Sequence, residues 1–278
     1  MKELIHIACA SDNAYVQHTG VMLTSLFQNN TDRVFHIHFF SASFDESNVR
    51  TIQKIVTEYK SSFTFYPLDE KIFKDCYISH HISYATYYRI VIPDTIDISV
   101  SKLMYMDTDI IINGKLDEMW ETNLGEQMLA AVQEPAFNEF ERLNLSPANK
   151  YFNAGILMIN CVAWREQIIT EKLFSFIKQY SNELTFWDQD ALNAILTKKW
   201  IELPPKWNLQ TPFFDLPRKK LIDVYGEKEL DEALQNPVII HYTGSSKPWD
   251  YINLHPLKKE YFKYLKLTAV SYTHLRAH

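Results

Sequence analysis

Short apolar runs alternate with segments of helical spacing along the first hundred residues. The runs over 4–10, 34–42 and 62–66 predict strands, because β-branched and aromatic residues dominate them or alternate with polar ones. The segments 15–27 and 45–59 carry apolar residues at helical spacing, which predicts helices. Strands that alternate with helices favour an α/β fold with a mainly parallel, twisted sheet flanked by helices. Ligands of such folds bind at the carboxyl ends of the strands.

The same alternation continues through the rest of the chain. We expect a central strand over 102–113 and further strands over 127–133, 151–160 and 237–241. Helices are expected over 83–92, 116–120, 164–180 and 187–196. A polar loop over 134–150 and a loop rich in Pro and aromatic residues over 204–217 separate these elements.

Asp107 and Asp109 interrupt the apolar strand predicted over 102–113. On an extended backbone, side chains two residues apart point the same way, so the two carboxylates would repel each other. A divalent cation bound between them would remove this repulsion. The pattern alone equally allows the strand to end at Asp107, with both carboxylates solvated or capping the next helix.

Composition narrows the classes of function. The 278 residues, 46% of them hydrophobic, are enough for one large domain or for a domain with an appendage. The net charge of −6 and the lack of a long basic run give no electrostatic support for a nucleic-acid partner. Cys9, Cys76 and Cys161 have neither disulfide-framework nor zinc spacing, and no run approaches the roughly 18 apolar residues of a membrane span. We therefore expect a cytoplasmic protein that is soluble or peripheral to a membrane.

Four motifs, in this order along the chain, resemble the family 8 glycosyltransferases. They are ASDNAY, YMDTD, YFNAGILMIN with WDQD, and HYTGSSKPW. The likeness is strongest to the bacterial lipooligosaccharide α-galactosyltransferase branch, with glycogenin more distant. It extends from about residue 4 to residue 249, and it implies a GT-A-type nucleotide-sugar-binding domain over residues 1–250.

The resemblance also implies an activity. The family transfers a hexose from a UDP-sugar with retention of anomeric configuration, using Mn²⁺. For this chain we expect UDP-galactose or UDP-glucose as donor and an α-glycosidic product. The acceptor would be a saccharide on a glycan, lipid or glycoprotein, as in lipopolysaccharide biosynthesis.

The metal ligands implied by the resemblance are Asp107, Asp109 and His241. Carboxylates suit Mg²⁺ or Mn²⁺, and the added imidazole favours Mn²⁺ over Mg²⁺. Gly244 permits close approach of the backbone to a phosphate, and Lys247 offers a positive charge to it.

The remaining donor contacts also follow from the resemblance. The residues implied are Asp12 for a hydrogen bond to uracil, Tyr15 for stacking on it, Arg89 for a donor contact, and Asn153 and Asp188 for the sugar hydroxyls. Ala14 stands where the galactosyltransferase branch has an Asn, so one uridine contact is missing or is made by the backbone.

Gln189 matches the residue that faces the anomeric carbon opposite the leaving group. An amide is a poor nucleophile, whereas double displacement needs a carboxylate in this place. Either Gln189 stabilises an oxocarbenium-like state during front-face attack, or Asp190 or Asp188 forms a transient covalent bond. The sequence leaves both mechanisms open.

Rival functions share parts of this pattern. An apolar strand that ends in DTDIII also resembles haloacid-dehalogenase phosphohydrolases, although that fold places the strand at its N-terminus. A sugar-phosphate nucleotidyltransferase would need a Gly-rich N-terminal loop, which ASDNAY is not. A non-catalytic UDP-sugar-binding protein would share the same binding residues.

The C-terminal region divides into two parts. Residues 251–267 are expected to form a helical extension, in which the stretch 261–267 (YFKYLKL) either packs on the core or lies on an anionic membrane surface. Residues 268–278 resemble no family element, and we interpret them as a non-native or truncated tail.

Overall fold

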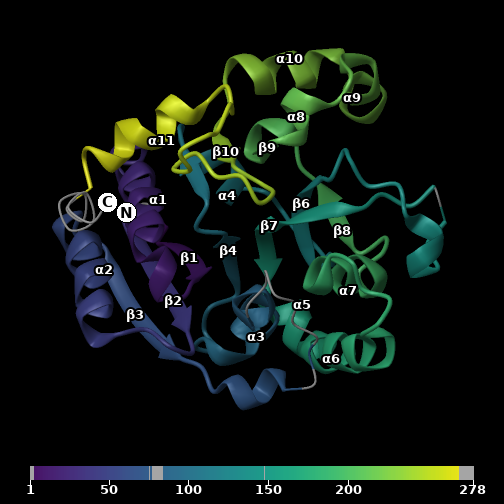
Figure 1. Ribbon diagram of the computed structural model, residues 1–278. Helices are drawn as coiled ribbons and strands as arrows, with labels where there is room; N and C mark the ends of the chain where they lie inside the picture. The colour runs from purple at the N-terminus through teal and green to yellow at the C-terminus, as the bar shows by residue number, and fades with distance from the viewer. Residues whose placement is uncertain (1–2, 75, 77–83, 147, 269–278) are drawn as a thin grey trace.

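A sheet with the strand order β3-β2-β1-β4-β7-β6-β8 crosses the molecule (Figure 1). The structure, a computed structural model, describes residues 3–74, 76, 84–146 and 148–268. The strands of this large sheet are β1 (Ile5–Ala10), β2 (Phe35–Ser41), β3 (Ser62–Pro67), β4 (Lys102–Met106), β6 (Leu129–Gln133), β7 (Phe152–Asn160) and β8 (Trp200–Glu202). Neighbouring strands are parallel except at β7, which is antiparallel to both β4 and β6. The predicted α/β fold with a mainly parallel sheet is confirmed.

Helices cover both faces of the large sheet, because side chains of each strand alternate between two apolar cores. On β1, Ile7 enters the core under α1 (Val16–Asn29) and α2 (Glu46–Glu58). Ala8 enters the opposite core, which is closed by α3 (Tyr88–Thr95), α5 (Cys161–Glu166), α6 (Ile169–Tyr180) and α7 (Trp187–Ile195). The central strands β4, β7 and β6 are therefore buried on both sides, as is usual in parallel sheets, whereas the edge strands β3 and β8 are partly exposed.

A second, three-stranded sheet lies beside the first, in the order β5-β10-β9. Its strands are β5 (Ile110–Ile112), β9 (Leu209–Gln210) and β10 (Ile239–His241). Strand β5 is antiparallel to β10, and β10 is parallel to β9. The short α4 (Asp117–Trp120) follows β5, and α8 (Pro212–Asp215), α9 (Arg218–Tyr225) and α10 (Glu227–Gln235) lie between β9 and β10 in the chain.

The last helix, α11 (Lys258–Leu265), packs beside α1 (Figure 1). Tyr261 and Tyr264 are both 2% exposed and share a core with Val21 of α1 and Ile240 of β10. This burial supports the core-packing interpretation of 261–267. Thr268, assigned above to the tail, is buried and donates a hydrogen bond to Tyr264 O at 2.7 Å. Residues 269–278 lie outside the described residues.

Several predicted elements differ from those observed. The strand expected over 102–113 is two strands, because the chain bends at 107–109 and passes from the large sheet to the small one. The helix expected over 164–180 is α5 and α6, which are separated by Ile168 at a φ of 48°. The loop expected over 204–217 contains β9 and α8, and α9 and α10 were not predicted.

The helix expected over 83–92 begins as a 3₁₀ turn, Tyr84–Tyr87, and continues as α3. Ser83, its predicted first residue, lies outside the described residues. No helix in the described part of the chain is long and apolar enough to cross a membrane.

Candidate active site

The bend at 107–109 places two carboxylates between the two sheets. The Asp107 N–H donates to Gly155 O of β7 at 2.8 Å, and the Tyr242 N–H donates to Asp109 O at 3.1 Å. The large sheet thus holds one end of the bend, and the chain after β10 holds the other. Because β10 ends at His241, its imidazole enters the space beside both carboxylates.

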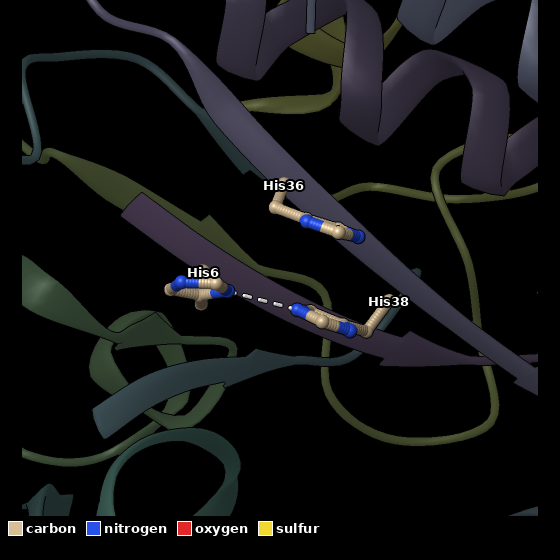
Figure 2. Close-up of side chains that lie close together, drawn as sticks. All are labelled: His6, His36 and His38. Carbon is tan, nitrogen blue, oxygen red and sulfur yellow. Dashed lines mark hydrogen bonds between the residues drawn. The ribbon is translucent and has the colours of Figure 1, made fainter. Parts of the chain in front are cut away.

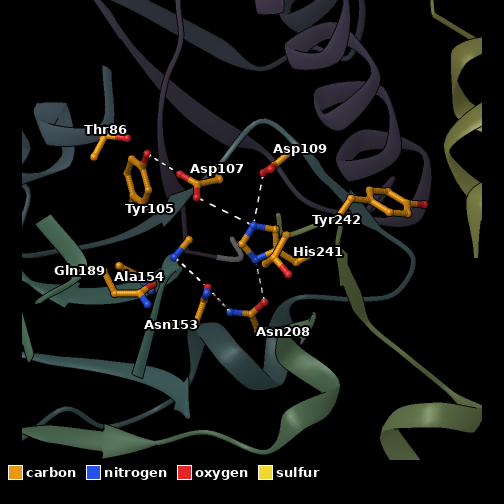
Figure 3. A network of polar contacts seen from close by, with 12 residues as sticks. Thr86, Tyr105, Asp107, Asp109, Asn153, Ala154, Gln189, Asn208, His241 and Tyr242 are labelled. Atoms are coloured by element: carbon orange, nitrogen blue, oxygen red, sulfur yellow. Dashed lines mark hydrogen bonds and ion pairs between the residues drawn. The ribbon is translucent and has the colours of Figure 1, made fainter. Parts of the chain in front are cut away.

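His241 faces the two carboxylates with one ring nitrogen (Figure 3). Its Nε2 lies 3.9 Å from Asp107 Oδ2 and 3.3 Å from Asp109 Oδ1. Its Nδ1 lies 3.0 Å from Asn208 Oδ1, which can only accept, so Nδ1 carries the proton. In the neutral ring, the Nε2 lone pair therefore points towards the carboxylates.

This group fits a divalent cation on three counts. The ligand atoms of Asp107, Asp109 and His241 all lie within 4.8 Å of one another. Asp109 Oδ1 is buried and accepts no hydrogen bond from the described residues. A Cβ on Gly155 would lie 2.7 Å from Asp107 Oδ2 and 2.2 Å from His241 Cε1. Only a glycine at position 155 therefore leaves room for these two side chains. Two carboxylates and one imidazole suit Mn²⁺.

The two carboxylates have opposite electrostatic environments. Burial raises the pKa of Asp107, and Arg89 opposes this effect only in part. Burial would also raise the pKa of Asp109, but Lys247 and His241 together hold that pKa below its usual range. Lys247 Nζ lies 2.6 Å from Asp109 Oδ2, and the lysine also donates to Tyr242 O at 2.8 Å. Asp109 is thus the more firmly ionised of the pair.

A cavity of about 920 Å³ opens in front of these carboxylates. Its lining includes the predicted site residues Tyr15, Arg89, Asp107, Asp109, Asn153, Asp188, Gln189, His241, Gly244 and Lys247. The loop over 134–150 and the segment over 204–217 also contribute to its wall. A volume of this size holds a ligand larger than a single sugar.

Arg89 forms ion pairs with two carboxylates of the cavity, those of Asp107 and Asp188. Its Nε lies 2.9 Å from Asp188 Oδ2 and its Nη2 lies 3.1 Å from Asp107 Oδ1, while Nη1 donates to Ala154 O. Burial raises the pKa of Asp188 to about 7, with Arg89 opposing the rise and Asp107 adding to it. The guanidinium, 8% exposed, is a buried cation inside the site rather than a surface charge.

Hydrogen bonds at β7 hold both Gln189 and Asn153. The Ala154 N–H donates to Gln189 Oε1 at 2.9 Å, which fixes the amide against β7. Asn153 Oδ1 accepts from Gly155 N and from Asn208 Nδ2, both at 3.0 Å. Helix α7, which carries Gln189, starts at Trp187 with a φ of 44°, a left-handed conformation that is uncommon outside glycine. The sharp entry to α7 turns Asp188 and Gln189 into the cavity.

Comparison with known proteins decides the family. The family model described as "Glycosyl transferase family 8" matches residues 6–253. The chain belongs to glycosyl transferase family 8.

Relatives in this family include enzymes and a stress protein. The chain is 34% identical to general stress protein A of Bacillus subtilis, with 96% of this chain and 94% of that protein covered. It is 27% identical to the lipopolysaccharide 1,3-galactosyltransferase of Salmonella typhimurium, with 92% and 76% covered. The crystal structure of galactosyltransferase LgtC with donor and acceptor sugar analogues has a TM-score of 0.85, 20% identity and coverage of 95% and 96%.

These matches confirm the predicted family and GT-A fold. As a family 8 enzyme the chain is a hexosyltransferase, with a nucleotide-sugar donor and a saccharide acceptor. They favour the transferase over the phosphohydrolase, nucleotidyltransferase and non-catalytic alternatives.

Two predicted residues of this family 8 chain do not line the cavity. Asp12 caps the 3₁₀ turn Asn13–Tyr15 by accepting from Ala14 N at 3.0 Å. Asp190 is fully buried, and its carboxylate accepts from Arg142, from the Tyr151 hydroxyl at 2.7 Å and from the backbone N–H groups of 185 and 186. The proposed nucleophilic role of Asp190 is therefore not supported by its position: it anchors the start of α7.

The sequence reasoning missed four residues that shape the site. Asn208 orients His241, and Gly155 leaves space for it. The Tyr105 hydroxyl donates to Asp107 Oδ1 at 2.7 Å, and Glu134, whose pKa is raised by burial, accepts from Asn153 at 3.2 Å. Tyr105 and Gly155 lie inside the quoted motifs YMDTD and YFNAGILMIN, which carried a signal in the sequence. Asn208 and Glu134 depend on contacts between distant segments.

Proposed function

We propose that this enzyme transfers galactose or glucose from a UDP-sugar to a saccharide acceptor, with Mn²⁺ and with retention of configuration. The observation that carries the proposal is one cavity that joins Asp107, Asp109 and His241 to Asp188 and Gln189. The first group suits a diphosphate with its cation, and the second suits a hexose.

Asp107, Asp109 and His241 would hold the cation at the diphosphate end of the cavity. When bound, Mn²⁺ offsets the negative charge that grows on the leaving oxygen as the glycosidic bond breaks. Lys247 and the backbone at Gly244, which has a φ of 87°, lie in the same wall and would approach the phosphates. Tyr15 would stack on the uracil at the cavity edge. Its ring packs edge to face with the Trp249 ring, with the two ring centroids 5.9 Å apart.

The hexose would lie against Asn153, Asp188 and Gln189. Asp188 and Arg89 form a buried pair that can accept from and donate to sugar hydroxyls. The Gln189 side chain lines the cavity and the Ala154 N–H holds its Oε1, whose second lone pair would stabilise developing positive charge. Asp190 is engaged elsewhere, and this favours a stabilising role for Gln189 over double displacement through Asp190.

The acceptor would enter between the loop over 134–150 and the segment over 204–217. Both contribute to the cavity wall, through 136–139 and through Thr211, Pro212 and Asp215. Loops at the mouth of a site can vary without disturbing the sheet, so acceptor choice would reside here.

We further propose a cytoplasmic enzyme that contacts the inner face of the membrane. Tyr251, Ile252 and Leu254 are 99%, 77% and 91% exposed, and Lys258 and Lys259 follow them. Apolar side chains beside lysines suit an anionic lipid surface. Sedimentation with anionic vesicles tests this contact, and a Tyr251→Ser/Ile252→Ser/Leu254→Ser variant should lose it.

A donor panel tests the main proposal. The protein is incubated with Mn²⁺ and, separately, with UDP-glucose, UDP-galactose, their N-acetyl forms and a phosphate ester, and released UDP and transferred sugar are measured. We expect a UDP-hexose to be used, EDTA to abolish the reaction, and Mn²⁺ to restore it better than Mg²⁺. Full activity in EDTA would contradict the metal site, and a β-linked product by proton NMR would contradict retention.

A further inference from the structure

Three histidines outside the cavity share one face of two neighbouring strands (Figure 2). His36 and His38 are two residues apart on β2, so their side chains point to the same face of the sheet. The strand register places His6 of β1 directly opposite His36. The group lies towards the amino ends of these strands, whereas the cavity lies at their carboxyl ends.

The three imidazoles are close enough to share one ion. Their ligand nitrogens all lie within 4.8 Å of one another, and His6 Nδ1 is 2.9 Å from His38 Nε2. The rings of His36 and His38 stack with centroids 4.2 Å apart. Nitrogens bound at 2.0–2.1 Å to a tetrahedral Zn²⁺ lie roughly 3.4 Å apart. Because the His6 ring lies at 23° to the His36 ring and at 27° to the His38 ring, binding one ion requires rotation of these side chains about χ1 and χ2.

Neighbouring hydroxyls on β3 already orient two of the rings. His36 Nε2 lies 2.8 Å from Thr64 Oγ1, and His38 Nδ1 lies 3.0 Å from the Tyr66 hydroxyl. Of the remaining nitrogens, His38 Nε2 faces His6 Nδ1 at 2.9 Å. Metal-binding histidines have the same arrangement, in which the second ring nitrogen is held by a hydrogen-bond partner.

We propose that His6, His36 and His38 form a second metal site, specific for a transition-metal ion of the zinc class. Three imidazoles without a carboxylate ligand favour Zn²⁺, Co²⁺ or Ni²⁺, whereas the carboxylate-rich active site suits Mn²⁺. His6 and His36 are half-buried, so one side of the site is open to solvent and to a water as fourth ligand. The bound ion would join β1 to β2, and the proposal is independent of the transferase function.

Zn²⁺ titration against a chromophoric chelator tests the site. The titration is done in an Asp109→Asn background, which weakens metal binding at the active site. We expect one Zn²⁺ equivalent that His36→Gln weakens by at least about a hundredfold, while His255→Gln, a histidine outside both groups, leaves it unchanged. Thr64→Val keeps the shape of the side chain but removes the partner of His36, and should weaken binding by about 10- to 100-fold.

Co²⁺ provides a second readout. Tetrahedral Co²⁺ should give visible absorption bands that His6→Gln and His36→Gln remove and His255→Gln retains. His6 and His36 are chosen because they are half-buried, and circular dichroism confirms that the variants fold. Zn²⁺ affinity that is the same with and without His36, or the absence of any bound equivalent in the Asp109→Asn protein, would overturn the proposal.

Discussion

Asp109 lies between Lys247 and His241, and both residues stabilise the negative charge of this carboxylate in the proposed metal site. Asp109→Asn keeps the shape and removes the charge, so the diphosphate would be poorly neutralised and would leave more slowly. We expect kcat to fall by roughly a hundredfold or more, about 3 kcal/mol, as for deletion of one strong electrostatic stabiliser. Asp231→Asn on α10, a half-buried carboxylate outside the cavity, is the control. Near-normal turnover in Asp109→Asn would mean that the DTD segment only ends a strand.

Gln189 lines the cavity on the side proposed for the hexose, and its Oε1 accepts a hydrogen bond from the Ala154 N–H. Because its amide would act on charge that exists only during bond breaking, Gln189→Ala should lower kcat more than donor affinity. Steady-state kinetics combined with calorimetric titration of UDP separates the two effects. Gln235→Ala, at the exposed end of α10, should change neither. A loss confined to donor affinity would assign Gln189 to binding.

Asp188 should make stability fall as pH rises. Burial raises its pKa to about 7 in the folded protein, against about 3.9 when unfolded. Between these values the folded state binds more protons, so the free energy of unfolding decreases with pH, by up to about 4 kcal/mol from this residue. Urea unfolding in EDTA at pH 4.5 and 7.5 should show a smaller pH-dependent loss in Asp188→Asn than in the unsubstituted protein. Equal losses would remove Asp188 as their cause.

At the scale of elements, β7 approaches the proposed metal site so closely at position 155 that there is no room for a side chain there. A Cβ at Gly155 would meet both His241 and Asp107. We therefore expect Gly155→Ala to displace one ligand and to raise the Mn²⁺ concentration needed for half-maximal activity by at least about tenfold, as loss of ligand orientation does. Unchanged Mn²⁺ dependence would show that the ligands lie elsewhere.

Helices and strands whose apolar residues recur with one clear period could be predicted from the sequence. Elements that depend on contacts with distant segments could not. The segments 15–27 and 45–59 are helices within a few residues, because their apolar faces lie on one sheet. The helix expected over 164–180 breaks at Ile168, where no glycine or proline signals the left-handed turn. The candidate active-site residues came from motifs. Asn208 lies outside them and was missed because only its contact with His241 gives it a role, whereas Gly155 lies inside YFNAGILMIN but its role depends on the approach of His241 and Asp107.

At the scale of the whole molecule, α11 closes the core against α1. The Tyr261 hydroxyl lies 2.7 Å from His18 Nδ1, and Asn29 Nδ2 donates to the Tyr264 hydroxyl at 2.7 Å. Ending the chain after Leu257 removes both buried rings and should lower Tm by at least about 5 °C. Ending it after Thr268 should leave Tm within about 2 °C. A large loss in the protein that ends at Thr268 would contradict the interpretation of the residues after it as part of a non-native or truncated tail.

The bend at 107–109 also has a consequence for how distant parts of the enzyme communicate. Asp107 is fastened to the large sheet through Gly155, whereas Asp109 and His241 belong to the small sheet and its flanks. A cation bound by Asp107, Asp109 and His241 would link the large sheet to the small sheet. By thermodynamic linkage, the free energy by which the cation would stabilise the joined sheets equals the free energy by which joining the sheets favours cation binding. Helix α11 packs on β5 and β10 through Tyr261 and Tyr264. We therefore expect changes in this packing to alter substrate affinity from a distance.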